Sequence, residues 1–78
     1  MHLEIITPDK RLYEGEAKAV TVPGSEGSLG ILNHHAAMVA SLKKGKVKVT
    51  TDTSEIKFFD IKGGVVEVLK NKVVVLAE

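Results

Sequence analysis

Short runs in which apolar and polar residues alternate recur along the whole chain, and helical periodicity is almost absent. The clearest run is KVKVTTD (46–52), where Val47 and Val49 are spaced for one face of a strand and the lysines for the other. LEIIT (3–7) is a short β-branched run, and the turn-forming residues of TPDK (7–10) follow it. The pattern predicts about eight short strands arranged as a sandwich or a flattened barrel.

The stretch after the first turn predicts longer and less regular elements. RLYEGEAKAVTVPG (11–24) indicates a long or bent strand with a bulge at Gly15, ended by its Pro-Gly pair. GSEGSLGIL (24–32) predicts a glycine loop followed by a brief strand at 29–32. HHAAMVASL (34–42) fits a helical turn or a strand, and we favour mostly strand because its apolar residues alternate and a glycine follows.

The C-terminal part predicts three further strands. SEIKFFDIK (54–62) alternates in two phases, which indicates either a switch of face or a strand covered on both sides. Gly63-Gly64 predicts a two-residue hairpin turn, because a primed turn needs positive φ at its central residues. GVVEVLKNKVVVLA (64–77) then predicts two strands joined around Asn71.

Length and composition limit the classes of function. Seventy-eight residues predict a single domain, residues 1–78. The chain has no cysteine, which excludes disulfide and thiolate chemistry. Eleven basic and ten acidic residues give a net charge of +1, unlike a dedicated nucleic-acid or anionic-membrane binder. No apolar run approaches the ~18 residues of a membrane span, and the start is not a secretory signal. We expect a soluble chain without direct lipid insertion, which reaches a membrane only through a partner.

The segment GSEGSLG has the glycine content of a phosphate-binding loop but not its other residues. The Walker pattern needs a lysine and a hydroxyl residue after the last glycine, whereas Ile31 and Leu32 follow Gly30 here. The dinucleotide fingerprint has another glycine spacing, and Glu26 would repel phosphate. We interpret the glycines as residues of a shaped loop.

No other residue pattern indicates a catalytic, metal or cofactor site. Side chains of adjacent residues in a strand point to opposite faces, so His34 and His35 would not share one ion there. His2 lies near a terminus, where no carboxylate is found at ligand spacing along the sequence. The serines lie in no nucleophile-elbow pattern. We therefore predict no catalytic residue, metal, cofactor or small-molecule substrate.

Two alternative functions follow from lysines. One is nucleic-acid binding through a basic stretch that comprises Lys43, Lys44, Lys46 and Lys48. Stacking platforms for nucleic acids use several exposed aromatic rings, whereas the whole chain has only three aromatic residues, and lysines on the outer face of a strand usually keep it soluble. The other is a lipoyl-type carrier, a small flattened β-barrel that presents a lysine in a hairpin, often as Asp-Lys. Asp9-Lys10 is such a pair, but carriers place theirs near the middle of the chain.

A series of motifs, read together, resembles one family. VPGSEGSLGIL combines a strand ending in Pro-Gly, a glycine loop and an apolar pair, and His35-Ala36 follows. GGVVEV begins at Gly63, and the chain closes with the strand VVVLA (73–77). In this order, over essentially all 78 residues, the sequence resembles the N-terminal β-sandwich domain of the ε subunit of rotary F-type ATP synthases.

The chain departs from that family in two places. The family's Pro-Gly-His-Ala-Pro is here NHHAA (33–37), where Asn33 can still turn because asparagine tolerates the left-handed region. The sequence stops at Glu78, where longer relatives continue into a helical hairpin that can inhibit ATP hydrolysis or help to bind ATP. Neither role is carried over, and we expect a short or truncated ε subunit without this hairpin.

The resemblance implies a fold, partners and contact residues. The fold is a flattened β-sandwich or barrel of two roughly five-stranded antiparallel sheets. The implied function is that of a non-catalytic rotor subunit of the central stalk, which binds the γ subunit and the c-ring and couples proton-driven rotation to ATP synthesis. It would lie at the cytoplasmic side of the membrane as a peripheral part of the complex. Positions matching the family's contacts are Glu26, Gly27 and Ser28 toward the c-ring, and Thr7, His35 and Ala40 toward γ.

Overall fold

The computed structural model describes residues 1–78 and contains eight β-strands and no helix. The prediction of an all-β chain is confirmed. The structure accordingly has no helix that is long and apolar enough to cross a membrane. The strands are β1 (His2–Ile6), β2 (Arg11–Gly24), β3 (Gly27–Leu32), β4 (Met38–Leu42), β5 (Gly45–Thr51), β6 (Ile56–Ile61), β7 (Gly64–Leu69) and β8 (Lys72–Ala77).

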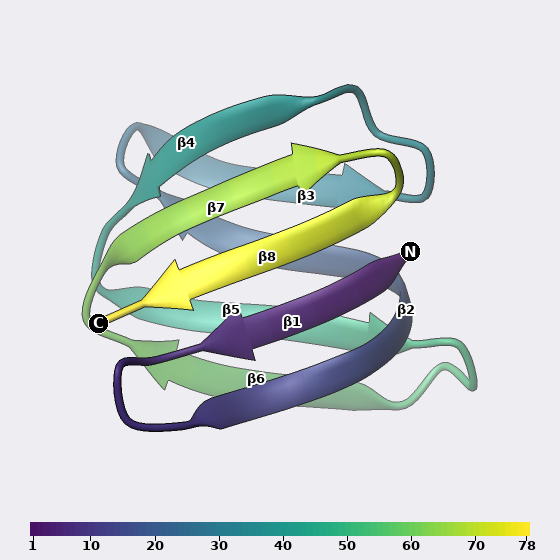
Figure 1. Ribbon diagram of the computed structural model, residues 1–78, viewed down its shortest axis with the longest axis horizontal. Helices are drawn as coiled ribbons and strands as arrows, with labels where there is room; N and C mark the ends of the chain where they lie inside the picture. The colour runs from purple at the N-terminus through teal and green to yellow at the C-terminus, as the bar shows by residue number, and fades with distance from the viewer.

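The strands form two layers that share the long strand β2. The first half of β2 pairs with β1, and the second half pairs with β3 and β5. One layer therefore contains β4, β7, β8, β1 and the first half of β2. The other contains β3, the second half of β2, β5 and β6. Figure 1 shows β4, β7, β8 and β1 side by side in front of β3, β5 and β6. The predicted β-sandwich and the predicted bent strand over 11–24 are confirmed.

One strand pair is parallel, which the expected antiparallel sheets did not include. β1 and β8 run in the same direction from His2↔Lys72 to Ile6↔Leu76, while the other pairs are antiparallel. Strands joined by a tight turn must be antiparallel. β1 and β8 are far apart in the sequence, so no short connection fixes their relative direction.

The space between the layers is filled by a single cluster of aliphatic side chains. Val47 and Val49 of β5 are fully buried, as their alternation with the lysines predicts. Burying a side chain of this size stabilises the fold by about 1.5–3 kcal/mol relative to leaving it in water. The largest fully buried members of the cluster are Leu3, Ile5, Ile31, Val20, Val22, Val47, Val49, Val66, Val73 and Val75.

The predicted bulge at Gly15 is wrong. Gly15 pairs with Leu3, and the register of β2 shifts at two other places, between Arg11 and Tyr13 against β1 and between Ala17 and Ala19 against β5. A Cβ at residue 15 would lie 3.3 Å from the hydroxyl oxygen of Tyr13. The glycine thus leaves room for the tyrosine ring to cross the strand.

β6 is a regular strand with one face inward. Ile61 is buried and Phe59 packs against the core, whereas Ile56 and Phe58 project outward and are more than half exposed. The pairing of β6 with β5 is uninterrupted. The strand therefore neither switches face nor is covered on both sides, and the double apolar phase reflects apolar residues exposed on the outer face.

Gly63-Gly64 does not form a hairpin. β6 pairs with β5 and β7 pairs with β4 and β8, so the two glycines carry the chain from one layer to the other. Both have positive φ, +148° and +138°, and a Cβ on Gly64 would meet the carbonyl oxygen of Leu76 at 2.1 Å. The two-residue hairpin turn lies between β7 and β8, where Lys70 and Asn71 have φ of 50° and 60°. The prediction of two strands joined around Asn71 is confirmed.

The β3–β4 loop turns at a different residue from the one expected. His34, not Asn33, has positive φ, at 63°. The side-chain oxygen of Asn33 accepts a hydrogen bond from the amino group of Met1, and that amino group also donates to the carbonyl oxygen of Ala17 at 2.9 Å. The asparagine side chain thus connects the loop to β2 through Met1, and its neighbour supplies the turn. β4 begins at Met38, so the segment 34–42 is a strand only over its second half.

Candidate functional site

The glycine segment forms a tight hairpin between β2 and β3. β2 extends to Gly24 and β3 begins at Gly27, so only Ser25 and Glu26 lie between the paired strands. The expected glycine loop, with a strand beginning only at 29, is therefore wrong in extent. Gly24 has no space for a side chain, since a Cβ there would lie 2.4 Å from the carbonyl oxygen of Gly27. Gly27 itself has φ of +133°, a conformation that favours glycine.

The hairpin is attached to the end of β4 by several hydrogen bonds. The N–H of Ser25 donates to the carbonyl oxygen of Ser41 at 2.9 Å, and the Ser41 hydroxyl donates to that of Ser25 at 2.9 Å. The N–H of Lys43 donates to the carbonyl oxygen of Pro23 at 2.8 Å, and Gly24 pairs with Leu42. These contacts join the two layers at one end of the sandwich.

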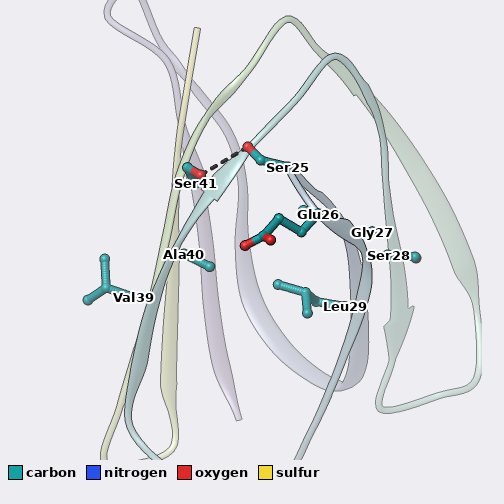
Figure 2. Close-up of a pocket in the computed structure, with 9 residues that line it drawn as sticks. Ser25, Glu26, Gly27, Ser28, Leu29, Val39, Ala40 and Ser41 are labelled. Carbon is teal, nitrogen blue, oxygen red and sulfur yellow. Dashed lines mark hydrogen bonds between the residues drawn. The ribbon is translucent and has the colours of Figure 1, made fainter.

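A hollow of about 430 Å³ lies between the hairpin and β4. Figure 2 shows the side chains of Leu29 and Ala40 directed into it, the Glu26 side chain extending across its opening, and Val39 turned away. The hollow is lined by Gly24, Ser25, Glu26, Gly27, Ser28, Leu29, Val39, Ala40 and Ser41. Residues from the predicted ring-facing tip and one predicted γ-facing residue, Ala40, therefore share a single concave surface.

Glu26 is the one charged residue among those lining residues. Its carboxylate has no hydrogen bond within the chain and no basic group within the 4.0 Å of an ion pair. A solvated carboxylate at the mouth of a neutral hollow attracts cations and basic side chains. Glu26 is among the residues selected from the sequence. The part of the hollow that β4 contributes depends on the contact between β2 and β4, which the sequence did not reveal.

The three predicted γ-facing residues do not form one patch. Thr7 lies in the β1–β2 turn, and β1 and β4 run in the same direction across the sheet. Thr7, which follows β1, and His35, which precedes β4, therefore lie at opposite ends of the strands. Thr7 is occupied in closing its turn, since its N–H and hydroxyl donate to the carbonyl oxygen of Lys10 at 2.8 and 3.0 Å. His35 is exposed, with Nδ1 2.7 Å from the carbonyl oxygen of Ala36.

Strand pairing brings His2 together with carboxylates, which the sequence reading missed. The side chains of His2, Glu4 and Glu14 present nitrogen and oxygen atoms within 4.8 Å of one another. Glu14 becomes a neighbour only through the β1–β2 register, so spacing along the chain gave no signal of it. Arg11 and Lys72 also contact these carboxylates, at 3.1 Å to Glu14 and 3.4 Å to Glu4. The cluster is thus a mixed-charge network on the outer face of the sheet.

The lysines behind the two alternative functions lie in separate places. Lys46 and Lys48 project from β5, and the ammonium of Lys46 is 2.8 Å from the carboxylate of Asp60. Lys10 lies in the β1–β2 turn, where its backbone N–H donates to the Thr7 hydroxyl at 3.1 Å. The basic stretch is thus partly balanced by an acidic neighbour, and Lys10 is one of several exposed residues in a tight turn.

Comparison with known proteins gives the family. The family model described as "ATP synthase, Delta/Epsilon chain, beta-sandwich domain" matches residues 1–78, which is the whole chain. The chain belongs to this family. The fold agrees, since the structure is a β-sandwich throughout.

Two curated relatives of the family differ in length. The ATP synthase epsilon chain of Alkalilimnicola ehrlichii is 37% identical over 78 residues, which is 100% of this chain and 56% of the relative. The ATP synthase epsilon chain of Caulobacter vibrioides is 38% identical over 78 residues, which is 100% of this chain and 90% of the relative. The chain thus spans little more than half of the first relative and most of the second.

A solved structure shares the fold. The matching chain comes from the cryo-EM structure of the Tetrahymena thermophila mitochondrial ATP synthase, described as central stalk and c-ring. It is 28% identical, with a TM-score of 0.83, over 99% of this chain and 62% of that chain. The family resemblance identified from the sequence motifs is therefore confirmed.

Proposed function

We propose that this chain is a non-catalytic subunit of the central stalk of a proton-translocating ATP synthase, which binds the γ subunit and the c-ring. The observation that carries the proposal is the match of the family model to all 78 residues. In this role the chain holds no substrate and transmits rotation from the ring to the shaft. It lies at the cytoplasmic side of the membrane as a peripheral part of the complex.

The architecture supports a role in transmitting force. β2 belongs to both layers, and the hairpin contacts with β4 join the layers again at one end. Layers joined in this way resist sliding over each other, because sliding would break backbone hydrogen bonds as well as core packing. A β-sandwich with short connections therefore suits a rotor part better than a chain with mobile loops.

The geometry refines the expected contacts. Glu26 lies in the hairpin turn, and Gly27 and Ser28 begin β3 next to it; we propose that these three residues contact the c-ring. Ala40 lies across the hollow from them, so the surfaces proposed for the ring and for γ adjoin each other. Because Thr7 and His35 lie at opposite ends of the strands, a γ surface that touches both would have to extend along the length of the sandwich, whose longest dimension is 27 Å.

A pull-down from gently solubilised membranes of the source cell tests the proposal. The tagged chain should recover γ together with the α, β and ring subunits, identified by mass. If none of these is recovered from cells with an intact synthase, the proposal is wrong. The two alternatives then become the leading hypotheses: a carrier would show a lipoyl mass shift on Lys10, and a nucleic-acid binder would give a salt-sensitive gel shift.

A pair of bulky substitutions tests the hairpin contact. Ser28 is exposed near the hairpin turn and has ordinary backbone geometry, whereas Gly27 has a positive φ that a side chain would strain. Ser28→Trp should reduce proton-coupled ATP synthesis in reconstituted vesicles while the domain keeps its unfolding midpoint. Asp52→Trp adds the same bulk at the exposed β5–β6 turn, at the other end of the sandwich, and should leave synthesis unchanged. Equal effects of both variants would contradict a contact at the hairpin.

A further inference from the structure

The strands on either side of the hollow have unprotected edges. β3 pairs only with β2, and β4 pairs with β7 and touches β2 at a single position. Neither strand, GSLGIL or MVASL, contains a charged residue or a proline. β6, another edge strand, carries Lys57 and Asp60. Charges and prolines are the usual protection of an exposed edge against pairing with other chains, so β3 and β4 have the composition of edges that are covered.

The backbone of β3 offers free hydrogen-bonding groups on the side away from β2. The carbonyl oxygen of Pro23 accepts from Lys43 and therefore points away from β3. Residues opposite each other in an antiparallel pair either both face each other or both face away. Ser28, the partner of Pro23, therefore directs its N–H and C=O to the open edge, and by alternation Gly30 does the same. None of the hydrogen bonds outside the strand ladders uses these groups.

The backbone of β4 has the same property on the facing side. The carbonyl oxygen of Ser41 accepts from Ser25, so Ser41 points away from β7. Val39, two residues before it in the same strand, therefore also directs its N–H and C=O away from β7. Ser28 and Val39 both line the hollow, from opposite sides. Two free strand edges thus border one hollow.

The hollow also has a chemical preference for its occupant. Leu29 and Ala40 point into it and give it an apolar floor, and the unpaired carboxylate of Glu26 stands at its mouth (Figure 2). Because β3 and β4 contain no basic residue, a second copy of this chain that paired through these strands would bring no lysine or arginine from within them. The charge therefore favours a different chain that carries a lysine or arginine.

We propose that the seam between β3 and β4, comprising residues 27–30 and 38–41 with Glu26, binds an extended segment of a partner chain as an added β-strand. The added strand takes hydrogen bonds from the Ser28 and Gly30 edge, places a small apolar side chain over Leu29 and Ala40, and places a basic side chain beside Glu26. The assignment of the partner to the ATP synthase rests on the proposed function, while the mode of binding rests on the edge geometry.

Amide hydrogen exchange tests the proposal on the unmodified chain. The probe, the shaft complex, is the ATP synthase with its shaft and c-ring, purified from the source cell and washed free of this chain, so that both partners proposed to adjoin the hairpin are present. In the free chain the amides of Ser28, Gly30 and Val39 should exchange rapidly, because their N–H groups face solvent. In the complex, Ser28 and Gly30 should slow by at least about tenfold, as expected for newly formed strand hydrogen bonds. Unchanged exchange at both residues in a formed complex would refute the added strand.

A matched pair of substitutions at Gly30 separates the effect of losing the backbone N–H from the effect of adding a side chain. Gly30→Pro removes the edge-facing N–H without taking a bond from β2, and proline is tolerated on edge strands. Gly30→Ala keeps the N–H and adds a methyl group where nothing lies within 4 Å. We expect Gly30→Pro to weaken binding to the shaft complex by about tenfold and Gly30→Ala by less than about threefold. Equal binding by both variants would overturn the proposal, and the exchange experiment decides if Gly30→Pro does not fold.

The charge at the mouth gives an independent test. Glu26→Gln keeps the shape of the side chain and removes its charge, so it should weaken binding several-fold at low salt and have little effect at high salt. If Glu26→Gln and the unmodified chain bind equally well at low and at high salt, the proposed basic side chain of the partner is contradicted. Failure of the unmodified chain to bind the shaft complex at all would refute the proposed function. Protection of Ser28 and Gly30 that rises with the concentration of the chain alone would assign the seam to a second copy.

Discussion

The side-chain oxygen Oδ1 of Asn71 accepts a hydrogen bond of 2.8 Å from the backbone N–H of His34. This bond joins the β7–β8 turn to the β3–β4 loop, and each of the two residues has positive φ. The backbone carbonyl of Asn71 also accepts from the N–H of His2 at 3.1 Å. One asparagine therefore connects both layers at the end of the sandwich opposite the hairpin.

Two substitutions of Asn71 should separate its two contributions. Asn71→Gly keeps a residue that tolerates φ of 60° and loses only the side-chain bond, which should lower the free energy of unfolding by about 1 kcal/mol. Asn71→Ala also strains the turn, so its loss should reach about 2 kcal/mol. Urea denaturation measures both. A glycine variant less stable than the alanine variant would contradict this assignment.

Gly64 should be the glycine least tolerant of substitution among those discussed. Its φ is +138°, and an added Cβ would lie 2.1 Å from the carbonyl oxygen of Leu76. Relieving this overlap requires β7 and β8 to separate, so Gly64→Ala should cost at least about 3 kcal/mol. Gly30→Ala is the control, since its Cβ meets nothing, and it should change stability by less than about 0.5 kcal/mol. Thermal unfolding of both variants provides the comparison.

Truncation of a core leucine should unfold a substantial fraction of the protein. Leu3 is fully buried between the layers. Leu3→Ala should cost about 3–4 kcal/mol from lost apolar contact and the remaining cavity, a large share of the stability of so small a domain. Leu69→Ala, at a position that is 59% exposed, should cost less than about 1 kcal/mol. The difference between their urea midpoints tests the assignment of the core, and similar midpoints would be inconsistent with it.

Burial, rather than distance, should rank the ion pairs. Glu4 has a side chain that is only 13% exposed, and Lys72 and Arg11 approach its carboxylate at 3.4 and 3.7 Å. Glu4→Gln should lower the free energy of unfolding by about 1 kcal/mol at low salt, and less at high salt.

The control for that prediction is the shortest ion pair of the chain. Lys46 and Asp60 are 2.8 Å apart, but their side chains are 63% and 81% exposed. Asp60→Asn should therefore change stability by less than about 0.5 kcal/mol. Denaturation at two salt concentrations tests both variants. A larger loss of stability from Asp60→Asn than from Glu4→Gln would show that distance, and not burial, determines the contribution of an ion pair.

Features fixed by neighbours in the chain could be predicted from the sequence. Strand alternation predicts Val47 and Val49 in the core, and Asn71 is the predicted junction between the last two strands. The predicted hairpin at Gly63-Gly64 is wrong because residues with positive φ occur both in hairpin turns and in connections between layers. The two differ only in which strands pair afterwards, and that depends on residues distant in the sequence.

The candidate site likewise combines features that the sequence predicts with features that depend on pairing between distant strands. Glu26 and Gly27 could be selected from the sequence through the family resemblance, because the motifs that carry the resemblance follow one another along the chain. Their position beside Ala40 depends on the pairing of Gly24 with Leu42, a contact between residues 18 positions apart that no local pattern encodes. The wide separation of Thr7 from His35 likewise follows from the direction of β1 and β4, which only the assembled sheet determines.

The parallel pairing of β1 with β8 has a consequence for how the chain folds during its synthesis. Of the eight strands of the sandwich, β1 is synthesised before the others, but one of its two neighbours, β8, is synthesised after them. Until Ala77 has emerged, a nascent chain holds β1 only through β2, and the layer lacks the strand that joins β1 to β7. Pairing across such a separation requires closure of nearly the whole chain, which makes folding slow relative to a helical bundle of this size. The sandwich is therefore completed only after translation of its final strand.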